Sequence, residues 1–435
     1  MQEVNPLLSP RTLLEHLFNA AVRSATPKDC MSLYLPEPPK GKTLVLGAGK
    51  AAAAMALSVE QMWPRDNPMS GLVVTRYGHT PKSNVIGSSS RIRIVEAAHP
   101  VPDEVGLDAT LEMLRLTDEL TEDDLVIFLL SGGASALLTL PEKGVDFEEK
   151  RQINLALLRS GASISEMNCV RRHLSSVKGG RMALACRPAK VLTLAISDVP
   201  GDDPAIIGSG PTTPDETTCE QALEILTRYE IQISESIRSG LISRTFESVK
   251  KQDLDETRYE TKIIATPRKA LDEAANVARS LGVTPYVLGD QFEGEARDMA
   301  KFHAALAQST TFHEEPFKRP CVLLSGGEAT VTVKGLKSAR GGRASEFCLS
   351  LAISLQGQKN VWGLAADTDG IDGSEFNAGA YVSPDTLFRG FSNGMDARKK
   401  LEENDSFTFF EKLGDLVVTG PTYTNVNDFR ALLVL

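Results

Sequence analysis

Short, continuous apolar runs that end in glycine or aspartate constrain this chain more than any other feature. In the first half they lie at 43–47, 71–75, 124–133 and 191–198. Runs of this length without polar alternation are typical of strands buried on both faces of a parallel sheet. Helical patterns lie between them, at 51–62 and 105–119. This alternation predicts an α/β fold with helices on both faces of the sheet.

The chain has 435 residues, which is too long for one ordinary core. From 215 to 261 the pattern becomes charged and helical, without a strong strand. Apolar runs then resume at 262–266, 284–289, 321–327, 329–335 and 361–367. The polar alternation in 329–335 indicates a mixed sheet. We therefore expect a Rossmann-like parallel-sheet sandwich in residues 1–250 and a second α/β domain with a mixed sheet in residues 251–435.

The formal charge of −10 disfavours nucleic acid and anionic membranes as partners, although a local basic pocket can still bind a small anion. The six cysteines have no metal-ligand spacing and are expected to be reduced thiols. No apolar run approaches about 18 residues, and no signal peptide is expected. We expect a cytoplasmic protein with small-molecule substrates and leave open whether it is a monomer or a homodimer.

The first candidate site is the segment 44–56, where a strand is followed by Gly47, Gly49, Lys50 and an alanine-rich helix. Glycines let a backbone approach a ligand closely, and a helix N-terminus offers N–H groups to an anion. Lys50 adds a positive charge. The alternative is a tight strand–helix turn with a solvated lysine.

A second glycine turn closes the run 124–133. Its Ser131, Gly132 and Gly133 have the composition of a phosphate-binding nest, and Ser135 is a candidate cap for the next helix. The segment 167–183 is basic and helical, so Arg171 and Lys178 either form a solvated face or bind a carboxylate or phosphate.

A long loop after the run 191–198 contains three carboxylates, Asp198, Asp202 and Asp203. Carboxylates in such a place hold Mg²⁺ with its waters or accept a proton from a substrate hydroxyl. The alternative is an ordinary turn, since turns are rich in Asp, Gly and Pro.

The second half contains further candidates. Arg343 lies in a glycine-rich loop before a helix, where a guanidinium can reach a transferring phosphoryl group. Asp369 lies in an Asp–Gly run after a strand and is a candidate metal ligand. The candidates for substrate or phosphate binding are Ser325, Gly326, Gly327, Glu328, Glu346 and Asn425. The first three repeat the Ser-Gly-Gly of the first half, so we expect another glycine turn at the end of a strand.

Glycine turns, cations and carboxylate clusters are the parts that phosphoryl transfer needs. A reductase that uses NAD(P)H needs fewer of them. The second strand ends in Arg76, which suits a 2′-phosphate, but a reductase leaves the aspartates unexplained. A sensor without catalysis on the same scaffold is the third alternative.

A set of motifs resembles the glycerate 2-kinases with a MOFRL domain, some of which are labelled hydroxypyruvate reductase. In chain order the motifs are GAGKAA, SGGASALL, NCVRRHLSSVKGG, SDVPGDDPAIIGSGPT, LLSGGEATV, GGRASEF, DTDGIDG and TNVND. The resemblance runs from about residue 8 to 431. It implies transfer of a phosphoryl group from ATP to O2 of D-glycerate, with Mg²⁺ or another divalent cation. It also implies two α/β domains with an active-site cleft between them.

The resemblance also implies roles for single residues. Lys50 becomes the principal catalytic cation, Asp198 a catalytic or metal-organising carboxylate, and Arg343 a ligand of the transferred phosphate. One departure stands out. The family loop usually reads GGRNQE, whereas this chain has Ala344 and Ser345 in place of the two amides.

Overall fold

The structure, a computed structural model of the chain, describes residues 9–81, 90–333 and 339–435. The chain divides into two compact units. The first-sheet unit is Cys30–Ile264, and the second-sheet unit combines Met1–Asp29 with Ala265–Leu435. The observed boundary thus follows Ile264 rather than residue 250, and the segment up to Asp29 belongs to the second-sheet unit.

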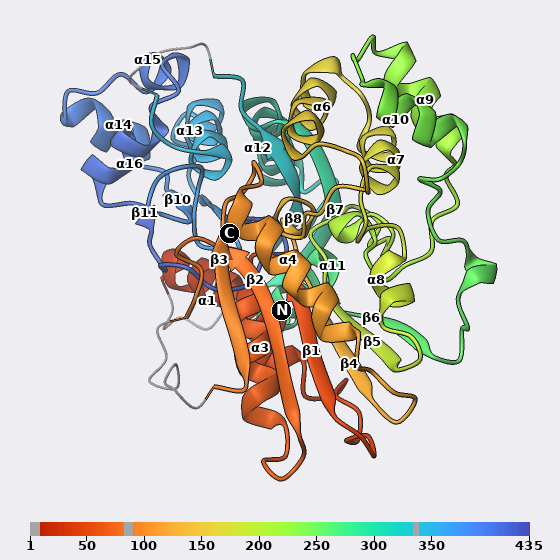
Figure 1. Ribbon diagram of the computed structural model, residues 1–435. Coiled ribbons are helices and arrows are strands. Elements are labelled where there is room, and N and C mark those ends of the chain that lie inside the picture. Colours follow the sequence, from red (N-terminus) through yellow and green to blue (C-terminus); the bar gives the residue numbers. More distant parts are fainter. Residues whose placement is uncertain (1–8, 82–89, 334–338) are drawn as a thin grey trace. The chain divides into compact units, whose positions relative to one another are not determined.

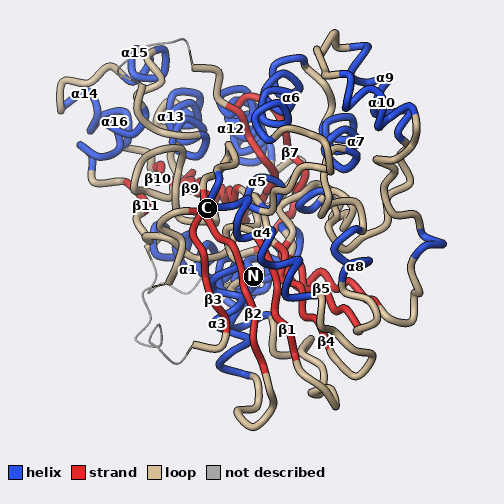
Figure 2. The backbone as a smooth tube through the Cα atoms, viewed as in Figure 1, coloured by secondary structure: helices blue, strands red, loops and turns tan. Residues whose placement is uncertain are grey.

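The first-sheet unit is built on a six-stranded sheet with the order β3-β2-β1-β4-β5-β6. Its strands are β1 Thr43–Ala48, β2 Met69–Arg76, β3 Ile92–Ala97, β4 Leu125–Leu130, β5 Lys190–Ile196 and β6 Tyr259–Ala265. β1 pairs with β2 and with β4 in parallel, and β4 pairs with β5 in the same way. Figure 2 shows β1, β2 and β3 side by side. The apolar runs in this half of the sequence are thus strands of a parallel sheet, as predicted.

Helices cover this sheet because its strands are apolar on both sides. Figure 1 shows α4 in front of the strands and α3 behind them. The helices of this unit are α3 Ala52–Met62, α4 Glu104–Thr117, α5 Ala134–Leu137, α6 Phe147–Ser160, α7 Ile164–His173, α8 Arg181–Ala185, α9 Cys219–Arg228 and α10 Glu235–Ile242. The short helix α2, Pro27–Cys30, lies at the junction of the two units.

The second-sheet unit holds a mixed sheet with the order β11-β10-β9-β12-β8-β7. β7 and β8 are parallel, whereas β12 pairs antiparallel with both β8 and β9. The strands are β7 Thr284–Glu295, β8 Cys321–Thr330, β9 Val361–Asp367, β10 Gly379–Val382, β11 Leu416–Val417 and β12 Asp428–Val434. The helices are α1 Pro10–Ala25, α11 Pro267–Ser280, α12 Ala296–His313, α13 Arg343–Leu355, α14 Thr386–Ser392, α15 Ala397–Glu402 and α16 Ser406–Leu413.

Packing explains the division of the chain. Helix α1 begins after Ser9, whose side chain accepts a hydrogen bond from the Thr12 N–H. Its buried Phe18 lies 5.7 Å from the ring of Phe429 on β12, so α1 packs on the second sheet. The strand expected at 262–266 is β6, which forms the edge of the first sheet rather than the start of the second.

The fold class is confirmed: both units are α/β, one sheet is parallel and the other is mixed. The strand expected at 329–335 is realised only in the last residues of β8, which ends at Thr330. Residues 334–335 of that prediction lie outside the described residues. Within the described residues, no helix is both long and apolar enough to cross a membrane.

Candidate active site

The two glycine turns of the first-sheet unit meet at one edge of its sheet. Lys50 follows β1, and Ser131 and Gly132 follow the neighbouring strand β4. The Lys50 N–H donates to the Gly132 carbonyl (2.8 Å), and the Ala51 N–H donates to Ser131 Oγ (3.0 Å). The sheet order reverses between β1 and β4, and in open α/β sheets ligands bind at that switch point.

Close packing requires glycine in the first turn. A Cβ on Gly49, whose φ is +135°, would lie 2.1 Å from Ser131 Oγ. Gly47 lies inside β1, where a Cβ would lie 2.3 Å from the Leu129 carbonyl oxygen. These glycines bring two strands together, and their part in phosphate binding stays a prediction.

Basic side chains gather at the same edge of the sheet. His99 and Lys50 both lie against Gly133, since a Cβ there would be 3.0 Å from His99 Cδ2 and 3.4 Å from Lys50 Cγ. Burial, followed by the charges of Lys50 and Arg76, lowers the pKa of His99 to about 4. Burial and the charge of Arg76 also lower the pKa of His79. Both imidazoles are therefore neutral near pH 7, inside a cationic field that favours an anion.

A cavity of about 210 Å³ opens beside these groups in the first-sheet unit. Its lining includes His99, Gly133, Ser135, Arg151 and Arg171, and no acidic side chain among the described residues. Burial lowers the pKa of Arg171, and within the described residues no carboxylate pairs with it. A guanidinium in such a place is suited to a carboxylate or phosphate ligand.

The loop after β5 reaches the same edge of the sheet, because β5 lies next to β4. Asp198 follows the end of β5 by two residues. Ser135 on α5 contacts this loop through Ser209, whose Oγ lies 3.0 Å away and donates to Asn168 Oδ1. The strand order β1-β4-β5 thus places Asp198 and Lys50 at the same end of the sheet, and their roles stay predictions.

Metal binding by the three predicted aspartates remains a prediction. Among the described residues, no group of three His, Cys, Asp or Glu side chains spaced for one ion includes Asp198, Asp202 or Asp369. Asp198 and Asp202 share one loop, and Mg²⁺ is often held by one or two carboxylates together with waters and substrate phosphates. The donor set of this loop therefore fits Mg²⁺.

The basic segment 167–183 is less exposed than a solvated helix face. Lys178 is 1% exposed and donates to the Leu138 carbonyl (2.7 Å). Burial lowers the pKa of Lys178 well below its ordinary value. Arg172 is also buried and pairs with Asp215 at 3.1 Å. Lys178 thus contacts the protein interior, and of the predicted pair only Arg171 lines the cavity.

Arg343, in the second-sheet unit, is surrounded by carboxylates. Its guanidinium lies 2.6 Å from Asp428, 2.8 Å from Asp367 and 2.9 Å from Glu328. These charges raise the pKa of Arg343, although burial opposes them. An incoming phosphate would have to compete with three carboxylates for this cation.

The second Ser-Gly-Gly segment is part of a strand rather than a turn. Ser325, Gly326 and Gly327 lie inside β8, and buried Ser325 Oγ is 2.8 Å from His303 Nε2. A Cβ on Gly327 would lie 2.3 Å from the Phe292 backbone of β7, which explains the glycine. This position corrects the expected strand-end turn.

Three other candidates of the second-sheet unit have internal partners. Glu346 is 2% exposed and pairs with Arg297 at 2.6 Å. Asn425 Oδ1 accepts from the Asn427 N–H (3.2 Å), and Asp369 Oδ1 accepts from the Ile371 N–H (2.9 Å). These contacts hold loops and a helix in place, so roles toward substrate remain predictions.

The departure at Ala344 and Ser345 lies at the start of α13. Asp372 accepts from the N–H groups of Ala344 (2.9 Å) and Ser345 (2.8 Å), and also from Ser345 Oγ. Burial raises the pKa of Asp372 to about 6. Ser345 Oγ lies 3.0 Å from Ser406 Oγ. The short side chains thus face the protein interior rather than a ligand.

His99 is a candidate site residue that none of the sequence motifs contains. His99 follows the end of β3 by two residues, and that position relative to a strand end is the signal that could have revealed it. Arg151, on α6, lies outside every motif that the sequence analysis singled out.

The fold and this candidate site are those of an α/β protein with cationic side chains beside glycine turns at the switch point of a parallel sheet. Two family models match the chain: Domain of unknown function (DUF4147), over residues 13–242, and the MOFRL family, over residues 321–428. A D-glycerate 2-kinase of Thermotoga maritima is 39% identical over 98% of this chain and 99% of its own length. A putative hydroxypyruvate reductase of Agrobacterium vitis is 48% identical over 98% of this chain and 95% of its own length.

The crystal structure of the Thermotoga maritima glycerate kinase matches with a TM-score of 0.88, over 97% of this chain and 99% of that one. The chain therefore belongs to the family of these DUF4147–MOFRL proteins, which includes glycerate 2-kinases, and the resemblance is confirmed.

Proposed function

We propose that this protein transfers the γ-phosphoryl group of ATP to the 2-hydroxyl of D-glycerate, with a divalent cation. The observation that carries the proposal is the cavity at the sheet edge, lined by His99, Arg151 and Arg171 without an acidic side chain among the described residues. Family membership supplies the substrate, since relatives over nearly the whole chain are named for glycerate.

Each proposed role follows from position and charge. Arg171 binds an anionic oxygen of a substrate, because burial without a carboxylate partner among the described residues favours an anionic ligand. Lys50 neutralises charge on the phosphoryl oxygens, and Asp198 orients the glycerate hydroxyl and accepts its proton. A new O2–P bond forms as the bond to the β,γ-bridging oxygen breaks, and ADP leaves. When bound, Mg²⁺ screens the phosphate charges, with Asp198 and Asp202 as the residues that would hold it.

The prediction that Arg343 also contacts the transferred group stays part of this proposal. Its three carboxylate partners imply that it would exchange a carboxylate for phosphate during turnover. A cytoplasmic location and a monomer or homodimer remain part of this proposal.

A hydroxypyruvate reductase is the second candidate, because relatives 48% identical have that name. In dinucleotide-binding folds the N–H groups of the first glycine turn face the pyrophosphate. Here the N–H groups of Lys50 and Ala51 already donate to Gly132 and Ser131. These two N–H groups are therefore engaged within the protein, which argues against a pyrophosphate on this turn and equally against these two groups as phosphate ligands of a kinase.

Two assays on the purified chain separate these functions. ADP release is measured with D-glycerate, ATP and Mg²⁺, and nicotinamide oxidation is measured with hydroxypyruvate and NADH or NADPH. The proposal requires glycerate-dependent ADP release and a product phosphorylated at C2 by ³¹P NMR. Nicotinamide oxidation without ADP release supports the reductase, and inactivity in both assays supports a sensor.

An Arg171→Met variant tests the cavity itself. The KM for glycerate or ATP should rise at least about tenfold, since a charged hydrogen bond contributes about 1.5–3 kcal/mol. Arg159→Met, on an exposed part of α6, is the matched control and should leave KM unchanged.

A further inference from the structure

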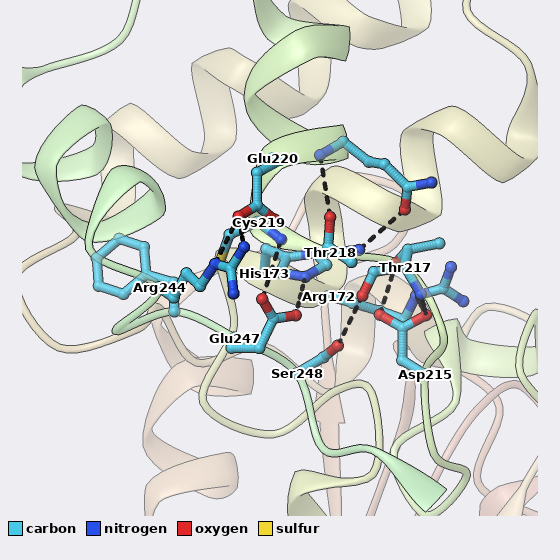
Figure 3. Close-up of polar contacts among 12 residues, drawn as sticks. Arg172, His173, Asp215, Thr217, Thr218, Cys219, Glu220, Arg244, Glu247 and Ser248 are labelled. Carbon is cyan, nitrogen blue, oxygen red and sulfur yellow. Dashed lines mark hydrogen bonds and ion pairs between the residues drawn. The ribbon is translucent and has the colours of Figure 1, made fainter.

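Three side chains with metal-ligating atoms meet in the first-sheet unit, outside the cavity. They are His173 at the end of α7, Cys219 at the start of α9 and Glu247 beyond the end of α10. One ligand atom from each lies within 4.8 Å of the other two. Figure 3 shows the three side chains close together, with Glu247 directed at His173.

Hydrogen bonds around the histidine leave one ring nitrogen facing the cluster. His173 Nδ1 lies 2.8 Å from the Cys169 carbonyl oxygen, which only accepts, so Nδ1 carries the proton. His173 Nε2 lies 3.2 Å from Glu247 Oε1. A neutral ring therefore directs its Nε2 lone pair at another acceptor. Either a second ring proton or a bound cation between the two atoms resolves this contact.

The separation of the His173 and Glu247 ligand atoms, 3.2 Å, is near that of two ligands of one tetrahedral ion. Ligands about 2.0–2.2 Å from tetrahedral zinc lie roughly 3.3–3.6 Å apart, close to the observed separation of the His173 and Glu247 atoms. A backbone carbonyl that accepts from Nδ1 is a common outer-shell partner of a metal-ligating histidine. The Cys219 N–H donates to Glu247 Oε2 (3.3 Å) and so orients the carboxylate.

The site has an entry path and a charge balance that admits a cation. His173 and Cys219 are buried, whereas the Glu247 side chain is 26% exposed. Lys250 lies 2.7 Å from Glu247, and its positive charge disfavours another cation beside that carboxylate. Its ammonium also donates to Ser248 Oγ (2.9 Å) and to the Asp215 carbonyl (3.0 Å), so other groups hold it in place. A thiolate and a carboxylate together balance a divalent ion.

We propose that His173, Cys219 and Glu247 bind a zinc ion, with water as the fourth ligand. On binding, the Cys219 S–H bond breaks, the proton passes to solvent and the sulfur–zinc bond forms. The mixed nitrogen, sulfur and oxygen donors favour zinc over Mg²⁺, which prefers oxygen ligands alone. The ion would fasten the α9–α10 segment to α7. The site does not depend on the proposed kinase activity.

Cobalt(II) is the spectroscopic probe for this site. The untagged chain, stripped with a chelator and then titrated with Co²⁺, should bind one equivalent at the cluster with a thiolate-to-cobalt charge-transfer band and intense visible bands of a tetrahedral ion. Zn²⁺ should displace the cobalt and raise the melting temperature. Cys219→Ser should lose the charge-transfer band, and Glu247→Gln should bind at least about tenfold more weakly.

Cys186→Ser removes another fully buried thiol of the same unit and should leave the band unchanged. Circular dichroism verifies the fold of each variant. Glu247 is partly exposed, so its variant is expected to fold even where Cys219→Ser does not. A wild-type chain without the charge-transfer band, or a folded Cys219→Ser variant that keeps it, overturns the proposal. The His173–Glu247 contact would then be an ion pair.

Discussion

Glu346 offers a sharp test of whether a predicted substrate residue is instead a structural one. Its carboxylate is 2% exposed and accepts from Arg297 Nε (2.9 Å), Arg297 Nη2 (2.6 Å) and Asn404 Nδ2 (2.8 Å). Glu346→Leu removes the negative partner and leaves the Arg297 guanidinium, whose side chain is 21% exposed, without its partner. Breaking a buried pair from one side costs about 3–5 kcal/mol.

The double variant Glu346→Leu/Arg297→Met distinguishes a role of Glu346 in the ion pair from a role in substrate binding. Replacing both charges with apolar side chains of similar volume is often neutral or stabilising. We therefore expect the free energy of unfolding, measured by urea denaturation, to fall by about 3–5 kcal/mol in the single variant and to recover most of that loss in the double variant.

The KM values for glycerate and ATP decide whether Glu346 has a structural role. A structural role predicts that the folded double variant retains the KM values of the wild type for glycerate and ATP. Equal stability of wild type and single variant, combined with a large rise in KM, would refute this reasoning and favour Glu346 as a substrate ligand.

Three further predictions concern the first-sheet unit. Burial lowers the pKa of Lys150 to about 7, so between pH 7 and its ordinary pKa of 10.5 the unfolded chain binds more protons than the folded chain. The free energy of unfolding of the wild type, relative to that of Lys150→Met, should therefore rise by up to about 1.4 kcal/mol per pH unit. A stability difference that does not change between pH 7 and 9 contradicts this prediction. Gly49→Ala places a Cβ 2.1 Å from Ser131 Oγ at a φ of +135°, so the free energy of unfolding from urea denaturation should fall by more than about 1 kcal/mol. An unchanged urea midpoint would contradict the close packing of this turn. His99, with a pKa of about 4, stays neutral from pH 5 to 9, so histidine ¹³C NMR should show its titration below pH 5, and a midpoint near 6.5 would contradict the cationic field.

The sequence predicted the strands and the turns of the first sheet, because a buried parallel strand has a clear local signature. Apolar runs that end in glycine became β1 and β4, and their adjacency brought Lys50 and Ser131 together. The position of Asp198 at the same edge followed from the neighbouring strand β5.

Long-range pairing and burial could not be predicted from local patterns. The apolar run of β6 does not reveal which sheet it joins. The Ser-Gly-Gly of β8 resembles a turn in sequence, and only the pairing of β7 with β8 explains the glycine at 327. The charge of Lys178 suggested solvent exposure, yet a carbonyl partner keeps it in the core. Tertiary contacts decided these positions.

The most direct test of the central claim is the rate of glycerate-dependent ADP formation by Lys50→Ala. Lys143→Ala, which removes an exposed lysine of the same unit, is the control. Our account predicts that kcat/KM falls by at least about a thousandfold in Lys50→Ala, with an unchanged circular dichroism spectrum, and that the control behaves as the wild type. Near-normal ADP formation by folded Lys50→Ala would contradict a phosphoryl-transfer site at the β1–β4 edge.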